Sequence, residues 1–370
     1  MDIGLISEYF PKSGGDEARG GVEYRAYYIA CMLARNHEVT VYTVKEGGSP
    51  PRDSFDGFNV EYVEPEIGYS HSGNLLERFN FMRNAGKNMA SAGHDLVDAY
   101  SFMSYPAGWR SGADARIATY HDVWAGRWMK IMGLKGALGE LLERYVLSRD
   151  WSHIIAVSDY TRRNLLAHGV DEEKVSVVHN GVSLKELGQV KAEKTLNPSI
   201  CVISRLVGYK RVGDVLEAAK KLEAYPSLKV DVVGTGPLLG RLKAKAKSLG
   251  IHERVTFHGY VKERVRMLEL LASSHCFILP SVVEGFGMTV VEAMGLGVPY
   301  AASDIPPVRE ATGGGVGGLL YPPGDIDSLS QAVERILAGG VKPDKSFVIE
   351  NYDWKKLAKS VAEIYEKTTD

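Results

Sequence analysis

The chain has 370 residues, of which 45% are hydrophobic and 24% charged, a composition typical of a globular protein with two domains. Its formal net charge of −2 argues against a general nucleic-acid-binding protein, which would carry a basic excess. The three cysteines, Cys31, Cys201 and Cys276, lie far apart in the sequence and predict neither a disulfide framework nor a zinc site.

Short apolar segments alternate with helix-length amphipathic segments along most of the chain, which is typical of parallel βαβ units. In the first half, strands are predicted at residues 3–7, 38–44, 60–63, 96–100, 117–120, 154–157 and 175–178. In the second half, they are predicted at residues 200–204, 229–233, 255–258, 276–279, 300–302 and 319–321. The polar segment 183–198 has no strand pattern, and we interpret it as a linker.

These elements predict an α/β fold of two Rossmann-like, doubly wound domains that face each other across a cleft. The N-terminal domain is predicted over 1–186 and the C-terminal domain over 187–351. Residues 352–370 have apolar side chains at helical spacing and are predicted to pack back toward the N-terminal domain. The sequence opens on a strand-like segment and contains no long apolar run, which favours a cytoplasmic protein without a membrane span.

The charge is distributed unevenly between the two halves. Up to Glu186 there are 20 basic and 25 acidic residues, and after it there are 24 and 21, so the halves carry −5 and +3. An anionic ligand is therefore expected to bind the second half.

The strongest motif is the segment 284–294, which directly follows a predicted strand. Its two glycines allow a tight turn, and the helix predicted to start near Met288 offers its positive end to anions or hydroxyls. Glu284 in the turn and Glu292 inside the helix place two hydrogen-bond acceptors on one side of the same loop and helix. The alternative is a glycine turn with two solvated glutamates, which the position after a strand makes less favourable.

Two further segments of the second half follow strands. Arg205 and Lys210 come after the first strand, where two fixed cations can hold a diphosphate; an exposed ion pair or a solvated face is the alternative. Gly234 opens a glycine turn after the next strand. The glycine spacing there is GxGxxxG rather than GxGxxG, so a nicotinamide-dinucleotide site is not favoured.

Together these segments resemble the motifs of retaining GT-B glycosyltransferases, in particular glycosyltransferase family 4, also called glycosyl transferases group 1. Glu284 and Glu292 match that family's two glutamates, which have seven residues between them. Residues 204–210 are similar to its Gly-Arg-Leu-Val-x-x-Lys-Gly motif, whose closing glycine is replaced here by Arg211. Residues 178–182 resemble its Pro-Asn-Gly-Val. The resemblance covers nearly the whole chain, most strongly in the second half.

The resemblance implies transfer of a sugar from a UDP- or GDP-sugar to a hydroxyl acceptor, with retention at the anomeric carbon. The implied catalytic residues are Arg205 and Lys210 on the leaving diphosphate, Glu284 on a sugar hydroxyl, and His121, after strand 117–120, on the sugar. Glu292 is implied to hold the ribose. The other implied donor contacts are Gly21, Gly234, Gly259, Tyr260, Val261, Phe286, Gly287, Met288 and Thr289.

The sequence shows no HxH, DxD or clustered Cys/His arrangement, so a metal-independent reaction without a cofactor is expected. No carboxylate stands out as a covalent nucleophile, which favours same-face attack within an ion pair over double displacement. Two other functions stay open, namely a sugar-nucleotide 2-epimerase of the GT-B fold and a non-catalytic protein that binds sugar nucleotides or glycans.

The acidic first half favours a neutral or weakly anionic acceptor over a polyphosphate or nucleic acid. One segment, 124–135, combines two tryptophans and other apolar residues with basic residues and no acid, a composition that can lie on a membrane surface. Peripheral membrane contact through Trp124–Lys135 is therefore an alternative to the ordinary packing at the cleft rim that we favour.

Overall fold

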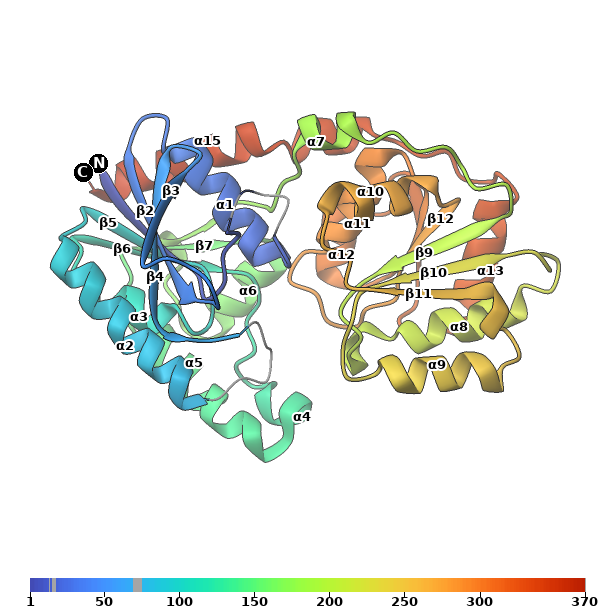
Figure 1. The fold of residues 1–370 in the computed structure, drawn as a ribbon, viewed down its shortest axis with the longest axis horizontal. Helices are drawn as coiled ribbons and strands as arrows, with labels where there is room; N and C mark the ends of the chain where they lie inside the picture. Colours follow the sequence, from blue (N-terminus) through green and yellow to red (C-terminus); the bar gives the residue numbers. More distant parts are fainter. Residues whose placement is uncertain (13, 15–17, 69–74, 370) are drawn as a thin grey trace. The chain divides into compact units, whose positions relative to one another are not determined.

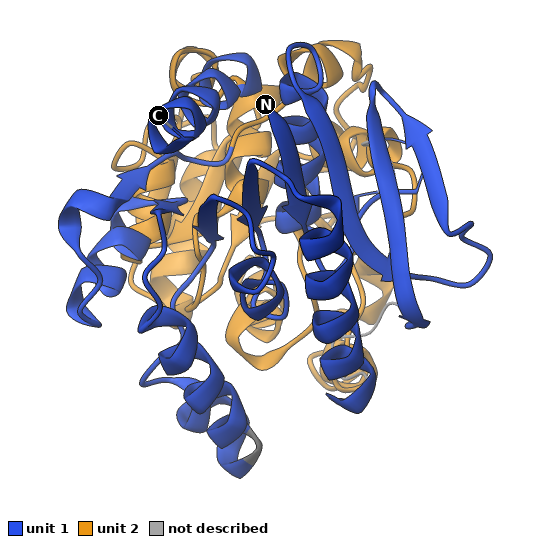
Figure 2. Cartoon of the chain, turned by 90° about the vertical axis from the view of Figure 1, so that its left-hand side faces the viewer, with its two compact units in different colours: residues 1–180, 354–370 blue, residues 181–353 orange. Residues whose placement is uncertain are grey.

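The computed structural model describes residues 1–12, 14, 18–68 and 75–369. The chain forms two compact units (Figure 2), unit 1 with residues 1–180 and 354–370, and unit 2 with residues 181–353. Each unit contains a largely parallel sheet with helices on its faces (Figure 1), so the predicted α/β fold with two Rossmann-like domains is confirmed. None of the described helices is both long and apolar enough to span a bilayer.

Unit 1 contains an eight-stranded sheet in the order β3-β4-β2-β1-β5-β6-β7-β8. Its strands are β1 (Asp2–Ile6), β2 (Glu38–Lys45), β3 (Arg52–Phe55), β4 (Phe58–Glu66), β5 (Leu96–Ala99), β6 (Ala115–Tyr120), β7 (His153–Ala156) and β8 (Val175–Val177). Every strand predicted in this half is present. Only β3 was missed, because it is a short, polar edge strand.

The missed strand pairs antiparallel with β4 through a two-residue turn at Asp56 and Gly57. Both turn residues have positive φ, 53° and 89°. An Asp-Gly pair is the sequence preferred for such hairpin turns, so the signal for this hairpin is present in the sequence.

Some helices of unit 1 pack on its sheet, and others project away from it (Figure 1). The helices are α1 (Gly21–Leu33), α2 (Leu75–Ala92), α3 (Tyr105–Trp109), α4 (Trp128–Met132), η2 (Gly133–Lys135), α5 (Gly136–Leu147), α6 (Asp159–Ala167), η3 (Glu172–Lys174) and α15 (Trp354–Thr369). The C-terminal helix α15 packs on α1, where the ring of Trp354 stacks on that of Tyr28 with centroids 5.8 Å apart. Its buried residues recur at helical spacing, as expected for an amphipathic helix.

Unit 2 contains a fully parallel six-stranded sheet in the order β11-β10-β9-β12-β13-β14. The strands are β9 (Ser199–Ile203), β10 (Lys229–Val233), β11 (Val255–Gly259), β12 (Cys276–Leu279), β13 (Tyr300–Ser303) and β14 (Gly318–Tyr321). This is the Rossmann order, in which the chain runs outward first on one side of the sheet and then on the other. Ligands bind such sheets where the order reverses, here beyond the carboxyl ends of β9 and β12.

The helices of unit 2 are α7 (Leu184–Gln189), η4 (Gly208–Lys210), α8 (Val212–Lys221), α9 (Leu239–Ser248), η5 (His252–Arg254), α10 (Arg264–Ser273), α11 (Met288–Leu296), α12 (Pro306–Ala311), α13 (Ile326–Leu337) and α14 (Ser346–Asn351). The segment 183–198, which we interpreted as a linker, begins with the helix α7. Ser183 caps this helix by accepting a hydrogen bond from the Glu186 amide.

Candidate functional site

The loop after β9 carries the two predicted cations. Lys210 donates from Nζ to Oε1 of Glu284 at 2.5 Å, and both side chains are largely buried. Arg205 is exposed and donates from Nη2 to the Tyr209 hydroxyl at 2.7 Å. The structure therefore joins a predicted cation after β9 to a predicted carboxylate after β12, at the reversal point of the sheet.

Arg211 stands where the resembling motif has its closing glycine, and its backbone adopts the conformation that glycine favours. Its φ and ψ are 46° and 33°, in the left-handed region. An L-residue other than glycine holds this conformation at a cost of roughly 1 kcal/mol. The Arg211 side chain pairs with Asp214 at 2.6 Å.

Main-chain contacts hold the loops after β9, β10 and β11 together. Gly234 has a φ of 124°, and a Cβ at this position would lie 2.0 Å from the Ser204 carbonyl oxygen. Its amide donates to the carbonyl of Gly259 at 2.7 Å. Gly234 and Gly259 are therefore neighbours, and the other two predicted contacts of this region, the exposed Tyr260 and the partly buried Val261, follow directly.

The turn after β12 leads into α11 as predicted. Gly287 has a φ of 106° and immediately precedes Met288, the first residue of the helix. The Phe286 side chain is buried and packs edge-on against Tyr352, with ring centroids 5.2 Å apart, so it anchors the turn. Of the predicted contacts here, Met288 and Thr289 contribute the first amides of α11, which have no acceptor within the helix.

Glu292 is buried on the second turn of α11, where Arg264, which is absent from the sequence prediction, holds it. Its Oε1 accepts from Nη2 of Arg264 at 2.6 Å, and Nε of Arg264 donates to Oε2 of Glu186 at 3.0 Å. Nothing in the sequence pattern pairs these residues, because they lie 28 and 78 positions apart.

In unit 1, His121 directly follows β6, and its Nε2 atom is buried without a hydrogen-bond partner among the described residues. Burial and, to a lesser degree, the charge of Arg25 lower the pKa of His121 to about 3. Arg25 is itself buried on α1 and donates from Nη1 to the carbonyls of Val178 and His179. Gly21, the other predicted contact in this unit, is exposed at the first position of α1.

His121 is therefore expected to be neutral throughout the physiological pH range. Because its pKa in the folded state lies below the ordinary value near 6.5, its contribution to stability is complete above about pH 6.5 and is lost as the pH falls toward 3. A histidine NMR titration between about pH 5 and pH 8 should show no change in the His121 ring resonances. A midpoint near pH 6.5 for His121 would contradict this burial.

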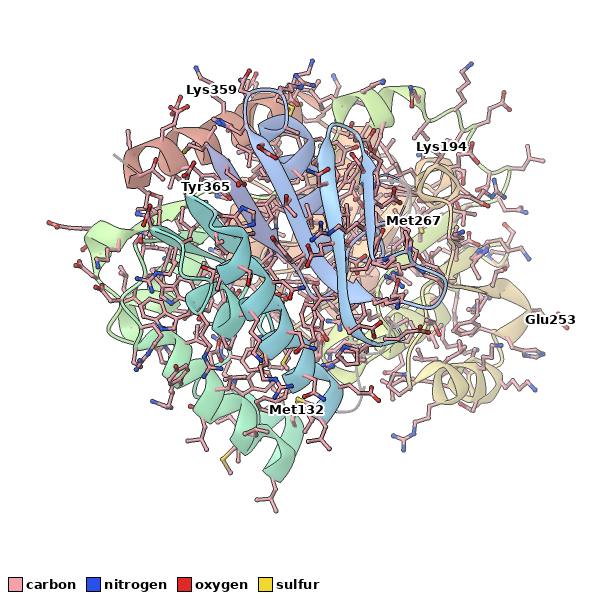
Figure 3. All side chains as sticks on the ribbon, turned by 60° about the vertical axis from the view of Figure 1, so that its left-hand side comes forward. Met132, Lys194, Glu253, Met267, Lys359 and Tyr365 are labelled. Atoms are coloured by element: carbon pink, nitrogen blue, oxygen red, sulfur yellow. The ribbon has the colours of Figure 1, made fainter. Side chains whose placement is uncertain are left out.

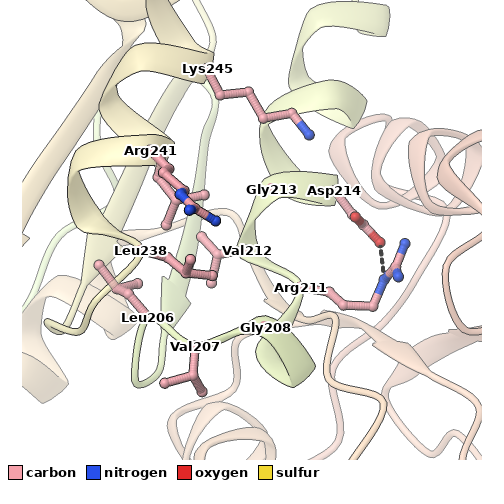
Figure 4. A pocket seen from close by; sticks show the side chains of 11 residues that line it. Leu206, Val207, Gly208, Arg211, Val212, Gly213, Asp214, Leu238, Arg241 and Lys245 are labelled. Atoms are coloured by element: carbon pink, nitrogen blue, oxygen red, sulfur yellow. Dashed lines mark hydrogen bonds and ion pairs between the residues drawn. The ribbon is translucent and has the colours of Figure 1, made fainter. Parts of the chain in front are cut away.

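A cavity of about 260 Å³ lies between the first turns of α8 and α9 (Figure 4). Its wall includes Arg211, Arg241 and Lys245, and the pair between Arg211 and Asp214 borders it. None of the predicted catalytic residues lines this cavity. The strand order and the pair of Lys210 with Glu284 locate the candidate site instead at the ends of β9 and β12.

The described residues contain no group of three or more His, Cys, Asp or Glu side chains placed to hold a metal ion. Arg205, Lys210 and the amide end of α11 supply positive charge in the loops after β9 and β12. An anionic ligand such as a diphosphate suits this arrangement.

Two family models match the chain, one on each half. Residues 19–186 match Glycosyltransferase Family 4, and residues 185–346 match Glycosyl transferases group 1. The chain is 25% identical to the uncharacterized glycosyltransferase MJ1607 of Methanocaldococcus jannaschii, over 99% of this chain and 98% of that protein. It is 29% identical to the lipopolysaccharide 1,6-galactosyltransferase of Salmonella typhimurium, over 51% of this chain and 53% of that protein.

Among solved structures, that of Anabaena Alr3699/HepE in complex with UDP and glucose superposes with a TM-score of 0.76. The two sequences are 17% identical, and the match covers 99% of each chain. At this identity, the likeness supports the same fold.

Proposed function

This chain is a glycosyltransferase of the GT-B fold, and we propose that it transfers a sugar from a nucleotide diphosphate to a hydroxyl acceptor with retention at the anomeric carbon. The observation that carries the proposal is the pair of Lys210 with Glu284, which links the loops after β9 and β12. A cation and a carboxylate at that point suit a ligand with a diphosphate and a hydroxylated sugar.

In the proposed reaction, the bond between the anomeric carbon and the diphosphate oxygen breaks while the acceptor hydroxyl forms a bond on the same face of the sugar. The acceptor proton passes to the departing diphosphate. Arg205, Lys210 and the first amides of α11 stabilise the charge that develops on that group, which is the main electrostatic requirement of the step. Glu284 holds a sugar hydroxyl, Glu292 holds the ribose, and His121 contacts the sugar.

The proposal includes metal independence, because fixed cations take the role of a divalent ion on the diphosphate. Activity is expected to survive EDTA, and NMR of the product should show the anomeric configuration of the donor. Incubation with donor alone should leave the sugar unepimerised, which separates this function from a 2-epimerase. Reversible loss of activity on chelation, an inverted product, or no product across a panel of donors and acceptors would contradict the proposal.

We propose UDP- and GDP-sugars as the donors to test first. HepE binds UDP and glucose in its solved structure, and this supports beginning with UDP-glucose. The loop Gly259–Val261 lies next to Gly234 and is the proposed contact of the base.

For the acceptor, the surface of α4 and α5 favours a lipid-linked molecule, for which we propose docking on an anionic bilayer. The apolar ridge, as we name it, consists of exposed side chains on these helices and on η2: Met129, Ile131, Met132, Leu134, Leu138 and Leu141. Leu134 has an exposed fraction of 86%. Met132, another residue of the apolar ridge, is labelled in Figure 3. The exposed Lys130 of α4 adds positive charge, whereas Arg144 of α5 pairs with Glu140 at 2.6 Å.

The two tryptophans that suggested membrane contact are only partly exposed in the structure. Trp124 and Trp128 pack on each other with ring centroids 5.2 Å apart, and Trp128 donates from Nε1 to Glu143 at 2.6 Å. Gly136 and Gly139 allow α5 to lie against Trp128, since a Cβ at either would approach it within 2.7 Å. The packing that we favoured from the sequence thus applies to the tryptophans, while the apolar ridge faces outward.

The apolar ridge should bind vesicles that contain anionic lipid, and Met132→Glu with Leu134→Glu should weaken that binding by at least about 10-fold. Co-sedimentation at low salt measures the bound fraction. Leu196→Glu is the matched control, because Leu196 is a fully exposed leucine of unit 2 and its replacement should change nothing. Wild-type protein that stays in the supernatant, or equal binding by the double variant, would contradict bilayer docking and favour a soluble acceptor.

A further inference from the structure

Three charged side chains form a largely buried cluster in unit 2. Arg264, the first residue of α10, lies between Glu186 of α7 and Glu292 of α11, with side-chain exposures of 9%, 14% and 4%. One guanidinium faces two carboxylates, so the three groups carry a net charge of −1. Buried charges of this kind are stable only when further hydrogen bonds satisfy their remaining donors and acceptors.

One oxygen of Glu292 lacks such a partner. Oε1 accepts from Arg264, whereas Oε2 is buried and has no hydrogen-bond partner among the described residues. An unsatisfied buried carboxylate oxygen costs about 1–3 kcal/mol or more. A ligand hydroxyl that donates to Oε2 would remove this cost, so the orphaned atom indicates where a ligand binds.

The position of Arg264 connects this oxygen to the rest of the donor site. Arg264 follows the loop after β11, which we propose contacts the base, and Glu292 lies one turn inside the helix whose first amides we propose contact the diphosphate. Glu186 is itself fixed, because it lies in the first turn of α7 and its amide donates to Ser183 Oγ at 3.2 Å. Glu186 therefore anchors the guanidinium through Nε, while Nη2 of the same group reaches Glu292.

We propose that Arg264, anchored by Glu186, is a positioning residue that occupies Oε1 of Glu292 and leaves Oε2 for a ribose hydroxyl of the nucleotide. This inference rests on the donor site proposed above. Because guanidinium nitrogens are fixed in a plane, the same group that holds α7 also sets the rotation of the Glu292 carboxylate. Arg264 thereby links base recognition on the β11 loop to ribose recognition on α11.

A purely structural role, in which Arg264 only joins three helices, would also lower stability when the residue is replaced. The two roles differ in ligand selectivity. A structural defect weakens all nucleotides alike, whereas loss of positioning weakens only nucleotides that carry ribose hydroxyls.

The test compares UDP and GDP with their 2′,3′-dideoxy forms by calorimetric titration of the wild-type chain, Arg264→Gln, Arg264→Lys and Arg266→Gln. The wild-type chain should bind the hydroxylated form of its nucleotide at least about 10-fold more tightly, since a hydrogen bond to a charged group contributes about 1.5–3 kcal/mol. Arg264→Gln should lose most of this ratio through weaker binding of the hydroxylated form. Arg264→Lys should lose part of it, because a lysine cannot form the fork to both carboxylates.

Arg266→Gln is the matched control, since Arg266 lies on the same helix but is exposed and pairs with Glu269. It should keep the wild-type ratio. If Arg264→Gln fully kept the wild-type ratio of affinities for the hydroxylated and dideoxy nucleotides, the inference would be overturned. If circular dichroism shows that Arg264→Gln is unfolded, full retention of this ratio in Arg264→Lys would overturn the inference instead. If the wild-type chain bound UDP or GDP no more tightly than their dideoxy forms, the inference about Arg264 would be overturned but the donor site would stand. A chain that binds neither nucleotide would overturn the donor site itself.

Discussion

Lys210→Ala is expected to lower kcat/KM by about 10- to 100-fold and to lower the melting temperature as well. The kinetic loss follows because a charge-assisted hydrogen bond contributes about 1.5–3 kcal/mol, and each 1.4 kcal/mol is about tenfold in rate. The stability loss follows because Glu284 would remain largely buried without its cation. Steady-state kinetics with a UDP- or GDP-sugar and calorimetry of unfolding measure the two effects.

Two companion variants separate catalysis from stability. Arg205→Ala should show a similar kinetic loss with little change in stability, because Arg205 is exposed and its hydrogen bond is with the Tyr209 hydroxyl. Lys210→Met combined with Glu284→Gln should recover stability without recovering activity, since no buried charge is left unpaired. Lys220→Ala, an exposed lysine of α8, is the control. Wild-type kinetics in both Arg205→Ala and Lys210→Ala would show that these residues do not serve the diphosphate.

Gly234→Ala is expected to have the largest structural effect at the candidate site. The added Cβ would lie 2.0 Å from the Ser204 carbonyl oxygen, and the φ of 124° is one that alanine rarely adopts. The loops after β9 and β10 must then move apart, and the hydrogen bond from Gly234 to Gly259 is lost with them. We expect a loss of several kcal/mol in stability, as for other steric and backbone defects in cores, together with loss of nucleotide binding.

The matched control is Gly240→Ala, whose Cβ would meet no atom within 4 Å. Gly240 lies in α9, where alanine is favoured over glycine by about 1 kcal/mol, so this variant should be as stable as the wild type or more so. Equal melting temperatures for Gly234→Ala and the wild type would refute the close main-chain packing on which the site depends.

The sequence predicts those parts of the site whose residues lie close together in one short segment. Glu284, Gly287 and Met288 share one strand-turn-helix unit, so their arrangement follows from local rules. Arg211 adopts a left-handed backbone conformation, which an arginine in the sequence does not predict. The backbone of that turn is therefore set by the surrounding fold as well as by the residue.

The contacts that the sequence does not reveal join elements far apart in the chain. Arg264 meets Glu292 and Glu186 only because α7 and α10 both pack against α11, and no sequence spacing encodes that meeting. Likewise, composition left membrane contact through Trp124–Lys135 as the alternative to packing, and only the structure shows that Trp128 packs against α5 while Leu134 is exposed. Pairing and exposure of this kind depend on tertiary packing, which hydrophobic periodicity alone does not specify.

If unit 2 binds a nucleotide diphosphate through Arg205 and Lys210, UDP or GDP should raise the thermal stability of the folded chain. At a ligand concentration 100 times its Kd, UDP or GDP should stabilise the folded chain by about 2.7 kcal/mol. We predict this shift for the wild type in the presence of EDTA, and its strong reduction in Arg205→Ala and Lys210→Ala at the same ligand concentration. No shift with any of UDP, GDP or ADP, or an undiminished shift in both variants, would contradict diphosphate binding by Arg205 and Lys210.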